Sequence, residues 1–480
     1  MKDKLKSIVD FLKKKKVDYA DIRQLKTLKE NIKVKNKGVE SLSKNENQGF
    51  GIRVIVDGAW GFASSSILTE AEMKKVANRA IQIAKASATT KKEDVDLTET
   101  EPYVDKYASK YSIDPFTVPL DKKIELLLDS TDILLKSDKI KVAEGSMSFT
   151  KTDKIFASTE GAFIEQSILH SGAGISATAV DGSEVQRRSY PTSFGGDFAT
   201  RGYEFVEEMK LLDNAEKVRE EALQLLVAEL CPDATTTIII TGGQMALQVH
   251  ESCGHPTELD RVLGTEISLA GGSFLSLDKK NKLKYGSDKV TITADATIPG
   301  GLGSFGYDDE GVKAQRVYLV KDGLFVGYLT SRETARVVGE RSNGTMRADG
   351  WNRIPLIRMT NINLEPGEWN FDDLIADTQE GILLDINKSW SIDDKRLNFQ
   401  FGTEIAWEIK NRKRGRVYKN PVYTGITPEF WNSCDAICNR NHWRVWGVPN
   451  CGKGEPMQIM HVAHGTSPAR FRNVKVGVSK

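Results

Sequence analysis

Two histidines and a glutamate stand within six residues, in the segment His250-Glu251-Ser252-Cys253-Gly254-His255. The imidazoles are five positions apart, and at 3.6 residues per turn a regular helix would place the second about 140° around the axis from the first. A regular helix therefore cannot direct both toward one point. Gly254 relaxes the backbone, and Pro256 disfavours further regular helix. We expect the helix to widen or unwind near Gly254, which turns His255 toward His250.

This group of residues has the chemistry of a metal site. Neutral imidazole is a good ligand for zinc, and a carboxylate beside a metal-bound water can take the proton of that water. A catalytic zinc usually has three protein ligands and one open position, so a third ligand is required. The sequence leaves several candidates for it: Cys451, His461, His464, Cys253, Cys434, Cys438, Glu258, Asp260 and His442.

The cysteines differ in how well they suit this role. Cys451 lies in a glycine-flanked segment, where a flexible loop could reach a metal and Lys453 would favour the thiolate. Cys434 and Cys438 lack the two-residue spacing of common zinc knuckles, and we interpret them as ordinary buried thiols. Cys253 would point off the wrong side of the motif, so we expect it to pack in the core.

The other histidines give weaker signals. His461 and His464 have a spacing that would suit a metal on a helix, but the Val-Ala pair between them and the following Gly465 favour a strand and a turn. We interpret His170 and His442 as structural residues. A site role for His461 and His464 therefore stays open as the weaker alternative.

Three further segments have a composition that could suit a binding site. The glycine-rich run 297–304 lacks the Gly-Lys-Ser/Thr ending of a P-loop, so we do not expect a phosphate site there. The segment Asp308-Asp309-Glu310-Gly311 favours an acidic turn over a cation site. The basic run 410–416 is typical of a solvated hairpin.

Composition excludes several classes of function. With 67 basic and 66 acidic residues among 480, the net charge of +1 indicates no basic surface for nucleic acid. No apolar run approaches the roughly 20 residues of a membrane span or has the form of a signal peptide. Five cysteines in a chain of this length do not indicate a disulfide framework. We therefore expect a cytoplasmic protein with reduced thiols and no membrane partner.

The chain is long enough for two domains. Cys231-Pro232-Asp233 ends a long helix predicted over 204–230, and it suggests a boundary between an N-terminal domain, 1–231, and a C-terminal domain, 232–480. We expect an α+β fold, with an antiparallel sheet and helices in the N-terminal domain and mostly short strands after the boundary. The polar segment 90–118 is predicted to be a linker or long loop.

Turn residues, helix caps and hydrophobic periodicity predict where the main helices and strands lie. Asp57-Gly58 between two strand-like runs predicts a tight hairpin. Thr69 and Glu72 form a capping box that opens a helix. Hydrophobic periodicity predicts the remaining elements: helices over 2–15, about 121–135 and about 371–380, and strands from about 140 to 190.

Taken together, these motifs resemble those of one family, the TldD/PmbA metallopeptidases, formerly described as modulators of DNA gyrase. The PmbA branch, also called TldE, lacks the metal motif, so this chain is more similar to the TldD branch or to a stand-alone member. The resemblance covers nearly the whole chain and depends on several segments in the right order: Gly51-Ile52-Arg53-Val54, Asp57-Gly58-Ala59-Trp60-Gly61-Phe62, His250-Glu251-x-x-x-His255, Asp308-Asp309-Glu310-Gly311, Arg358-Met359-Thr360-Asn361, Pro366-Gly367 and Cys451-Gly452-Lys453-Gly454.

The resemblance implies a set of site residues. The family's metal ligands correspond to His250, His255 and Cys451, with Glu251 as the catalytic carboxylate and Zn²⁺ as the metal. The implied C-terminal domain is β-rich and barrel-like. Pro256 stands where the family pattern has glycine, and proline can still end a helix there.

We therefore expect a zinc peptidase that hydrolyses peptides or unfolded chains in an enclosed cavity, with Glu251 as general base. The resemblance also implies a dimer, formed with a second copy or with a PmbA/TldE-like subunit. Two alternatives stay open: a non-catalytic partner or regulatory subunit of a peptidase complex, and a metal-dependent hydrolase of non-peptide amides.

Overall fold

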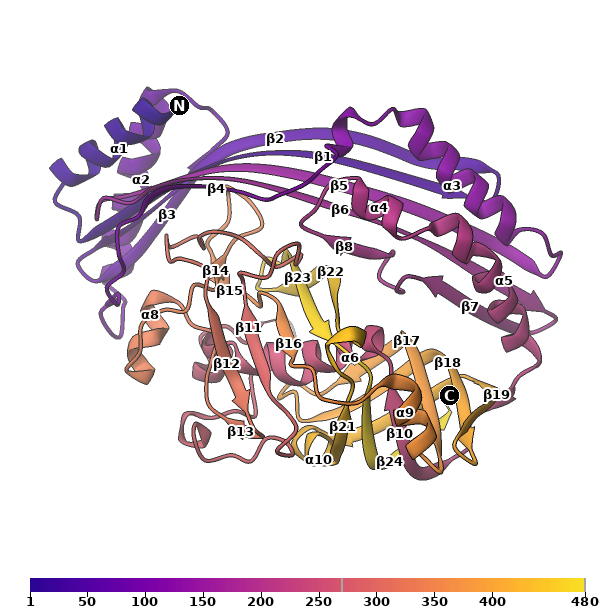
Figure 1. The fold of residues 1–480 in the computed structure, drawn as a ribbon. Helices are drawn as coiled ribbons and strands as arrows, with labels where there is room; N and C mark the ends of the chain where they lie inside the picture. Colours follow the sequence, from indigo (N-terminus) through magenta and orange to yellow (C-terminus); the bar gives the residue numbers. More distant parts are fainter. Residues whose placement is uncertain (269–270, 479–480) are drawn as a thin grey trace.

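The computed structural model describes residues 1–268 and 271–478. The fold is α+β, as the sequence predicts. A long curved antiparallel sheet from the N-terminal part arches over a strand-rich body formed by the C-terminal part (Figure 1). No helix within these described ranges is long and apolar enough to cross a membrane.

The arched sheet has eight strands, in the order β3-β2-β1-β5-β6-β4, with β7 and β8 also paired to β6. Its longest strands have 19 residues, which at 3.3 Å per residue gives a length of about 60 Å. The bounds are β1 (Tyr19–Lys35), β2 (Gly38–Val56), β3 (Ala59–Ser65), β4 (Val104–Ala108), β5 (Ile140–Ser158), β6 (Phe163–Asp181), β7 (Glu184–Tyr190) and β8 (Asp197–Ala199).

Helices pack on this sheet in two groups, one at each end of the arch (Figure 1). Their apolar faces form two separate hydrophobic cores with the strands beneath them. One group contains α1 (Lys2–Lys14) and α2 (Glu70–Ala88), and the other contains α3 (Leu120–Leu134), α4 (Glu204–Glu208) and α5 (Leu211–Val227).

Several local predictions are confirmed. Asp57 and Gly58 both have positive φ, 51° and 68°, and connect β2 to β3 in the tight turn expected of an Asp-Gly hairpin. The Thr69 side chain accepts a hydrogen bond from the backbone N–H of Glu72 and caps α2. The helices expected near 2–15, 121–135 and 371–380 are all present, within a few residues of the predicted ends.

Two predictions were wrong. The long helix expected over 204–230 is divided into α4 and α5, because Lys210 between them adopts the left-handed backbone conformation with φ 50°. The segment 90–118 is not only a loop: it contains β4, which pairs in parallel with β6 at the edge of the sheet.

The C-terminal part is built around a closed five-stranded barrel. Its strands follow the order β17-β10-β24-β20-β18, and β18 pairs back to β17, which closes the ring. β10 and β17 are parallel, and the other pairings are antiparallel. The expected β-rich, barrel-like domain is therefore confirmed. The bounds are β10 (Ala234–Ile240), β17 (Glu380–Ile392), β18 (Asn398–Lys410), β20 (Pro421–Ile426) and β24 (Ala469–Val478).

Smaller elements surround the barrel, and many of them contribute to its main hydrophobic core, while α9 (Phe371–Asp377) packs in a second core. The strands are β9 (Glu229–Leu230), β11 (Ile292–Asp295), β12 (Arg316–Lys321), β13 (Leu324–Phe325), β14 (Met346–Arg347), β15 (Leu356–Ile357), β16 (Ile362–Leu364), β19 (Lys413–Lys419), β21 (Cys434–Ile437) and the hairpin of β22 (Arg444–Lys453) with β23 (Gln458–Thr466). The helices are α6 (Gly242–Val249), α7 (Leu259–Leu263), α8 (Arg332–Ala335), α9 (Phe371–Asp377) and α10 (Thr427–Asn432). All five cysteines are buried free thiols, so the expectation of no disulfide framework is confirmed.

The acidic segment 308–311 forms a turn, but the turn is buried between the two parts of the molecule. Asp309 accepts a hydrogen bond at 2.5 Å from Lys154 of β5, and it lies 3.4 Å from the guanidinium of Arg23 of β1. Burial alone would raise the pKa of Asp309, but these two cations outweigh it and lower the pKa to about 2. This segment therefore joins the arched sheet to the barrel domain.

Two histidines also bridge the two parts. His170 of β6 and His461 of β23 share a hydrogen bond of 2.8 Å between their Nδ1 atoms, which requires at least one neutral ring. Burial lowers the pKa of His461 to about 4, with smaller effects from Lys29 and Arg347. Burial and the neighbouring His461 also hold the pKa of His170 well below its usual range. His461 is therefore a contact between the two parts of the molecule.

We expect this histidine pair to make the stability of the protein depend on pH. Because the folded state lowers the pKa of His461 from 6.5 to about 4, the unfolded chain binds more protons in this range. The stabilisation is complete above pH 6.5 and is lost as the pH falls toward 4. Urea midpoints measured from pH 7 to pH 4 should fall less steeply in the double variant His170→Gln/His461→Gln than in the wild type, whereas equal slopes would contradict this expectation. His442→Gln is the matched control.

Candidate metal centre

The metal motif begins where the chain leaves the barrel. β10 ends at Ile240, and α6 then runs through the interior of the domain with all eight of its residues buried. Gly242 opens this helix beside an aromatic ring: a Cβ there would lie 3.1 Å from Nε1 of Trp446. The close approach of α6 to the β22–β23 hairpin delivers His250 into the interior of the protein.

The helix changes its winding at the motif. Residues His250–Gly254 form a π-helical turn, in which the backbone N–H of His255 donates to the carbonyl of His250, five residues earlier. A 3₁₀ turn, His255–Thr257, follows. The centroids of the two imidazole rings are 4.9 Å apart. The widening predicted from the five-residue spacing is therefore confirmed, and it directs both rings to one place.

Gly254 is required at this turn for a second reason. A Cβ at this position would lie 2.0 Å from Sδ of Met359, far inside van der Waals contact. The backbone of the turn therefore packs directly against the Met359 side chain. Glycine both permits the wider winding and leaves room for this neighbour.

Cys451 completes a cluster of three side chains that could hold a metal ion. Its Sγ lies 3.7 Å from Nε2 of His255, and donor atoms of His250, His255 and Cys451 all lie within 4.8 Å of one another. Cys451 is not on a flexible loop, as the glycine-flanked sequence suggested. It belongs to β22, just after an irregularity in the pairing with β23, and it is buried.

Hydrogen bonds fix the ring of His250. Nδ1 of His464 lies 3.1 Å from the carbonyl of Ile362, which can only accept, so this nitrogen carries the proton. Nε2 of His464 then accepts from Nδ1 of His250, at 2.8 Å. Nε2 of His250 is therefore left without a proton and is free to bind an ion.

The carboxylate of Glu258 fixes the ring of His255. Nδ1 of His255 lies 3.1 Å from Oε2 of Glu258, so Nε2, which faces Cys451, is free for an ion. Burial opposes ionisation of Glu258, but Lys453 and His255 outweigh it and hold its pKa well below the usual range. Two residues from the list of third-ligand candidates, His464 and Glu258, therefore fix the rings of His250 and His255 by hydrogen bonds.

The electrostatics of the cluster suit a cation. Burial lowers the pKa of both His250 and His255, which favours the neutral, metal-binding form of each ring. Burial would raise the pKa of Cys451, but His255 and Arg358 outweigh it, so the pKa is lowered and the thiolate is favoured. Two neutral imidazoles and a thiolate are a donor set that fits zinc.

Lys453 does not have the predicted role beside Cys451. Its ammonium donates to both carboxylate oxygens of Asp260, at 2.7 and 2.8 Å, and to the carbonyl of Ile357. Arg358 takes its place: it donates to the backbone carbonyl of Cys451 and favours the thiolate by its charge. The prediction that Lys453 favours the Cys451 thiolate, made because the two are close in sequence, was therefore wrong.

Glu251 lies next to the cluster. Its side chain is buried, and Oε2 accepts a hydrogen bond from Nη1 of Arg396, which belongs to the loop between β17 and β18. No sequence pattern around Arg396 marks it as a site residue. Only the closure of the barrel brings that loop to the motif.

The remaining candidate ligands lie outside the cluster. Cys253 packs in the main hydrophobic core, as do Cys434 and Ile437 of β21. Cys438 is buried in a smaller core on the other side of the barrel sheet. Nε2 of His442 accepts from the backbone N–H of Phe371 at the start of α9, which is a structural role.

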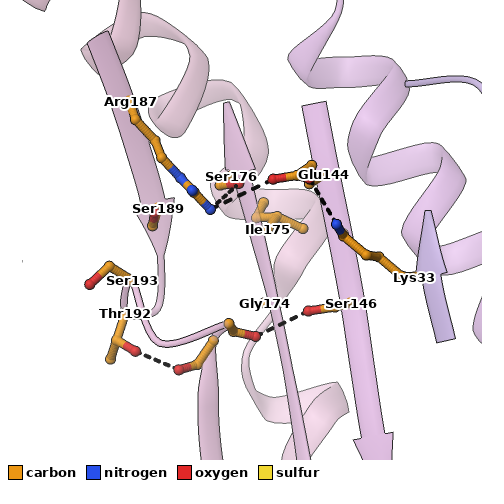
Figure 2. A pocket seen from close by; sticks show the side chains of 13 residues that line it. Lys33, Glu144, Ser146, Gly174, Ile175, Ser176, Arg187, Ser189, Thr192 and Ser193 are labelled. Carbon is orange, nitrogen blue, oxygen red and sulfur yellow. Dashed lines mark hydrogen bonds and ion pairs between the residues drawn. The ribbon is translucent and has the colours of Figure 1, made fainter. Parts of the chain in front are cut away.

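A separate hollow of about 370 Å³ lies on the arched sheet, lined by residues of β1, β5, β6 and β7 and of the segment 192–196 (Figure 2). Lys33 points toward Glu144, at 3.0 Å, and Arg187 donates to the hydroxyl of Ser176, at 3.1 Å (Figure 2). These two charged groups are therefore already paired with neighbours in the wall of the hollow. None of the clustered metal-binding residues lines it.

Comparison with known families decides the relationship of this chain. Three family models match it: PmbA/TldA metallopeptidase domain 1 over residues 20–84, the central domain over 113–230 and the C-terminal domain over 233–478. The chain belongs to the PmbA/TldD metallopeptidase family. The resemblance inferred from its motifs is therefore confirmed.

Relatives of PmbA/TldD type match over most of their length. A metalloprotease of Methanocaldococcus jannaschii is 32% identical over 422 residues, which cover 88% of this chain and 89% of the relative. A protein of Haemophilus influenzae named a metalloprotease TldD homolog is 25% identical over 477 residues, covering 98% and 95% of the two chains. A protein of Saccharolobus solfataricus named a zinc metalloprotease TldD homolog is 21% identical over 469 residues, covering 96% of each.

A crystal structure from Thermotoga maritima has the same fold. That protein is described as a candidate modulator of DNA gyrase, and its structure superposes with a TM-score of 0.79 at 17% identity, covering 99% of each chain. At this identity the likeness concerns the PmbA/TldD fold alone. The name of that neighbour says nothing about the chemistry of the site described above.

Proposed function

We propose that the protein is a zinc-dependent peptidase of the TldD type. One observation carries this proposal: donor atoms of His250, His255 and Cys451 lie within 4.8 Å of one another, beside the carboxylate of Glu251. Three protein ligands with room for one more are the usual arrangement of a catalytic zinc. The metalloprotease names of the relatives support the same choice.

The residues of this chain suit the steps of peptide hydrolysis. Bound zinc supplies a Lewis acid that lowers the pKa of water and polarises a carbonyl. Glu251 accepts the proton of the water that attacks the scissile carbonyl carbon, and it returns this proton to the amine nitrogen as the C–N bond breaks. Glu258 and His464 keep the two imidazoles oriented throughout.

We propose peptides and unfolded chains as the substrates. The site residues are only 3–6% exposed, so the surface of a folded protein cannot reach them, whereas an extended chain is narrow enough to enter and to pair with strands. We also propose a dimer, with a second copy or with a PmbA/TldE-like subunit, because an enclosed chamber needs walls from more than one chain. Free cysteines support a cytoplasmic location.

A cleavage assay tests the proposed function. The zinc-loaded protein is incubated with a random-sequence peptide library, and the new termini are identified by mass spectrometry. We expect cleavage that stops when 1,10-phenanthroline removes the metal and returns when zinc is added back, while a stably folded protein stays intact. Hydrolysis of small non-peptide amides without any peptide cleavage would instead identify an amide hydrolase. A zinc-loaded dimer that cleaves neither would identify a regulatory subunit.

A further inference from the structure

We infer that Arg396 binds the carbonyl oxygen of the scissile bond and stabilises the negative charge that develops on it. This inference rests on the proposed peptidase function and adds a residue to it. Arg396 lies on the loop between β17 and β18, far in sequence from every segment that carries the family resemblance to a metallopeptidase.

The loop holds the backbone of Arg396 in one position. Its N–H donates to the carbonyl of Asp393 at 2.8 Å, and its carbonyl accepts from the Thr427 hydroxyl at 2.9 Å. The Asp393 carboxylate accepts from the N–H of Leu397, at 2.8 Å, and braces the same turn. Arg396 itself has φ 63°, a left-handed conformation that is unfavourable for a non-glycine residue. A residue kept in this conformation is presented to the site by its surroundings.

The guanidinium of Arg396 has unused hydrogen-bonding capacity. The residue is 4% exposed, and its side chain donates to one acceptor, Oε2 of Glu251. Nε is buried and has no partner among the described residues. A buried donor without an acceptor costs free energy, so this pattern indicates that an acceptor is supplied from outside the chain.

The position of this charge fits a role at the reacting carbonyl. Nη1 of Arg396 donates to the carboxylate of Glu251, which follows His250 directly in the chain. A substrate carbonyl beside Glu251 is therefore within the field of the guanidinium. Donors fixed beforehand at the point where charge develops are among the largest contributors to enzymatic rates.

Arg347 and Arg358 near the site also have a buried Nε without a partner among the described residues, but their other guanidinium nitrogens have different partners from those of Arg396. Arg358 donates to the backbone carbonyls of Cys451 and Gln458, and it ties the two strands of the hairpin together. Arg347 donates to the backbone carbonyls of His461 and Met359. Both therefore support the structure, whereas Arg396 bonds to the one carboxylate that is assigned a chemical step.

The total charge of Glu251 and the carbonyl oxygen beside Arg396 stays constant during the attack of water. When water attacks, its oxygen bonds to the carbonyl carbon, the π electron pair moves to the carbonyl oxygen, and Glu251 takes the water proton. The carboxylate becomes neutral as the oxygen becomes negative, so Arg396 exchanges one anionic partner for the other. The C=O bond then re-forms, the C–N bond breaks, and the proton passes from Glu251 to the leaving nitrogen.

The test compares Arg396→Met, Arg396→Lys and the wild type, with Lys395→Met as the matched control. Lys395 is the exposed neighbour of Arg396 on the same loop. The probes are a library peptide that the wild type cleaves and its phosphinic analogue, in which a tetrahedral anionic phosphorus group replaces the scissile amide. Zinc content, thermal midpoint, kcat, KM and the Kd of the analogue are measured for each zinc-loaded protein.

For Arg396→Met we expect wild-type zinc content, KM within a few-fold of the wild type, and kcat lower by about 10²–10³-fold, as for the loss of an oxyanion donor. The Kd of the analogue should rise by a similar factor. Arg396→Lys should recover part of both losses, and it keeps the test valid if the methionine variant does not fold. Lys395→Met should match the wild type.

Two results would overturn the inference while leaving the peptidase proposal intact. If kcat falls but the analogue binds as tightly as to the wild type, Arg396 acts only by positioning Glu251. If neither changes, Arg396 has no part in the reaction. A wild-type protein that cleaves no peptide overturns the proposed function itself, and the inference about Arg396 with it.

Discussion

Replacing Glu251 with glutamine is expected to slow peptide cleavage by about 10²–10⁴-fold, the usual effect of losing a general base. Glutamine has nearly the same shape, but its amide cannot take the proton of the attacking water. Zinc binding should be unchanged, because the clustered donors come from His250, His255 and Cys451. Zinc is counted by atomic emission after dialysis, and kcat is measured with a peptide that the wild type cleaves.

The substitution also preserves the surroundings of this side chain. The glutamine oxygen can still accept from Arg396, so the loop between β17 and β18 keeps its anchor. The matched control is Glu229→Gln, which removes an exposed carboxylate at the edge of the barrel sheet and should cleave like the wild type. Cleavage at the wild-type rate by Glu251→Gln would exclude Glu251 as the base, and loss of zinc would show that it helps to bind the metal.

Cys451→Ala is expected to lose zinc. Removing even a residue that only orients a ligand typically weakens metal binding by about 10–100-fold, so losing a ligand should cost more than roughly 100-fold. The remaining pair, His250 and His255, leaves two of the four positions of a tetrahedral ion to water. Affinity is measured by competition with a chromophoric chelator, which does not depend on catalytic activity.

A second buried cysteine provides the control for this experiment. Cys434 is a free thiol in the hydrophobic core, and its alanine variant loses packing but should retain wild-type zinc affinity. If Cys451→Ala instead retains zinc with unchanged affinity, Cys451 is not a ligand. The third position would then pass to His464, whose ring lies beside that of His250.

The unusual winding of the motif could be predicted because its causes are local. The five-residue interval between His250 and His255 is incompatible with a regular helix, and Gly254 and Pro256 stand where the winding must change. In the structure, one π-helical turn and one 3₁₀ turn replace the regular helix at this point. The Asp57-Gly58 hairpin was predictable for the same reason, since both residues adopt the backbone angles that such a turn requires.

Features that depend on distant contacts could not be predicted. Lys210 ends a predicted helix by adopting positive φ, yet no glycine or proline marks the position. Cys451 has glycine beside it like a loop residue, but its pairing with β23 makes it part of a strand. Arg396 reaches Glu251 across 145 residues of sequence, and this approach is set by closure of the barrel. The residues around Arg396 contain no local pattern that would predict its contact with Glu251.

The spacing of the clustered donors determines when this site can exist during synthesis. Cys451 follows His255 by 196 residues, and a ribosome adding about 5–20 residues per second needs roughly 10–40 s to cover that distance. The residues of the arched sheet are synthesised first. Lys154 of this sheet cannot pair with Asp309 until that residue is added, 155 residues later. A nascent chain of this protein therefore has no complete donor set. An enzyme proposed to cut unfolded chains thus remains inactive while it is itself unfolded.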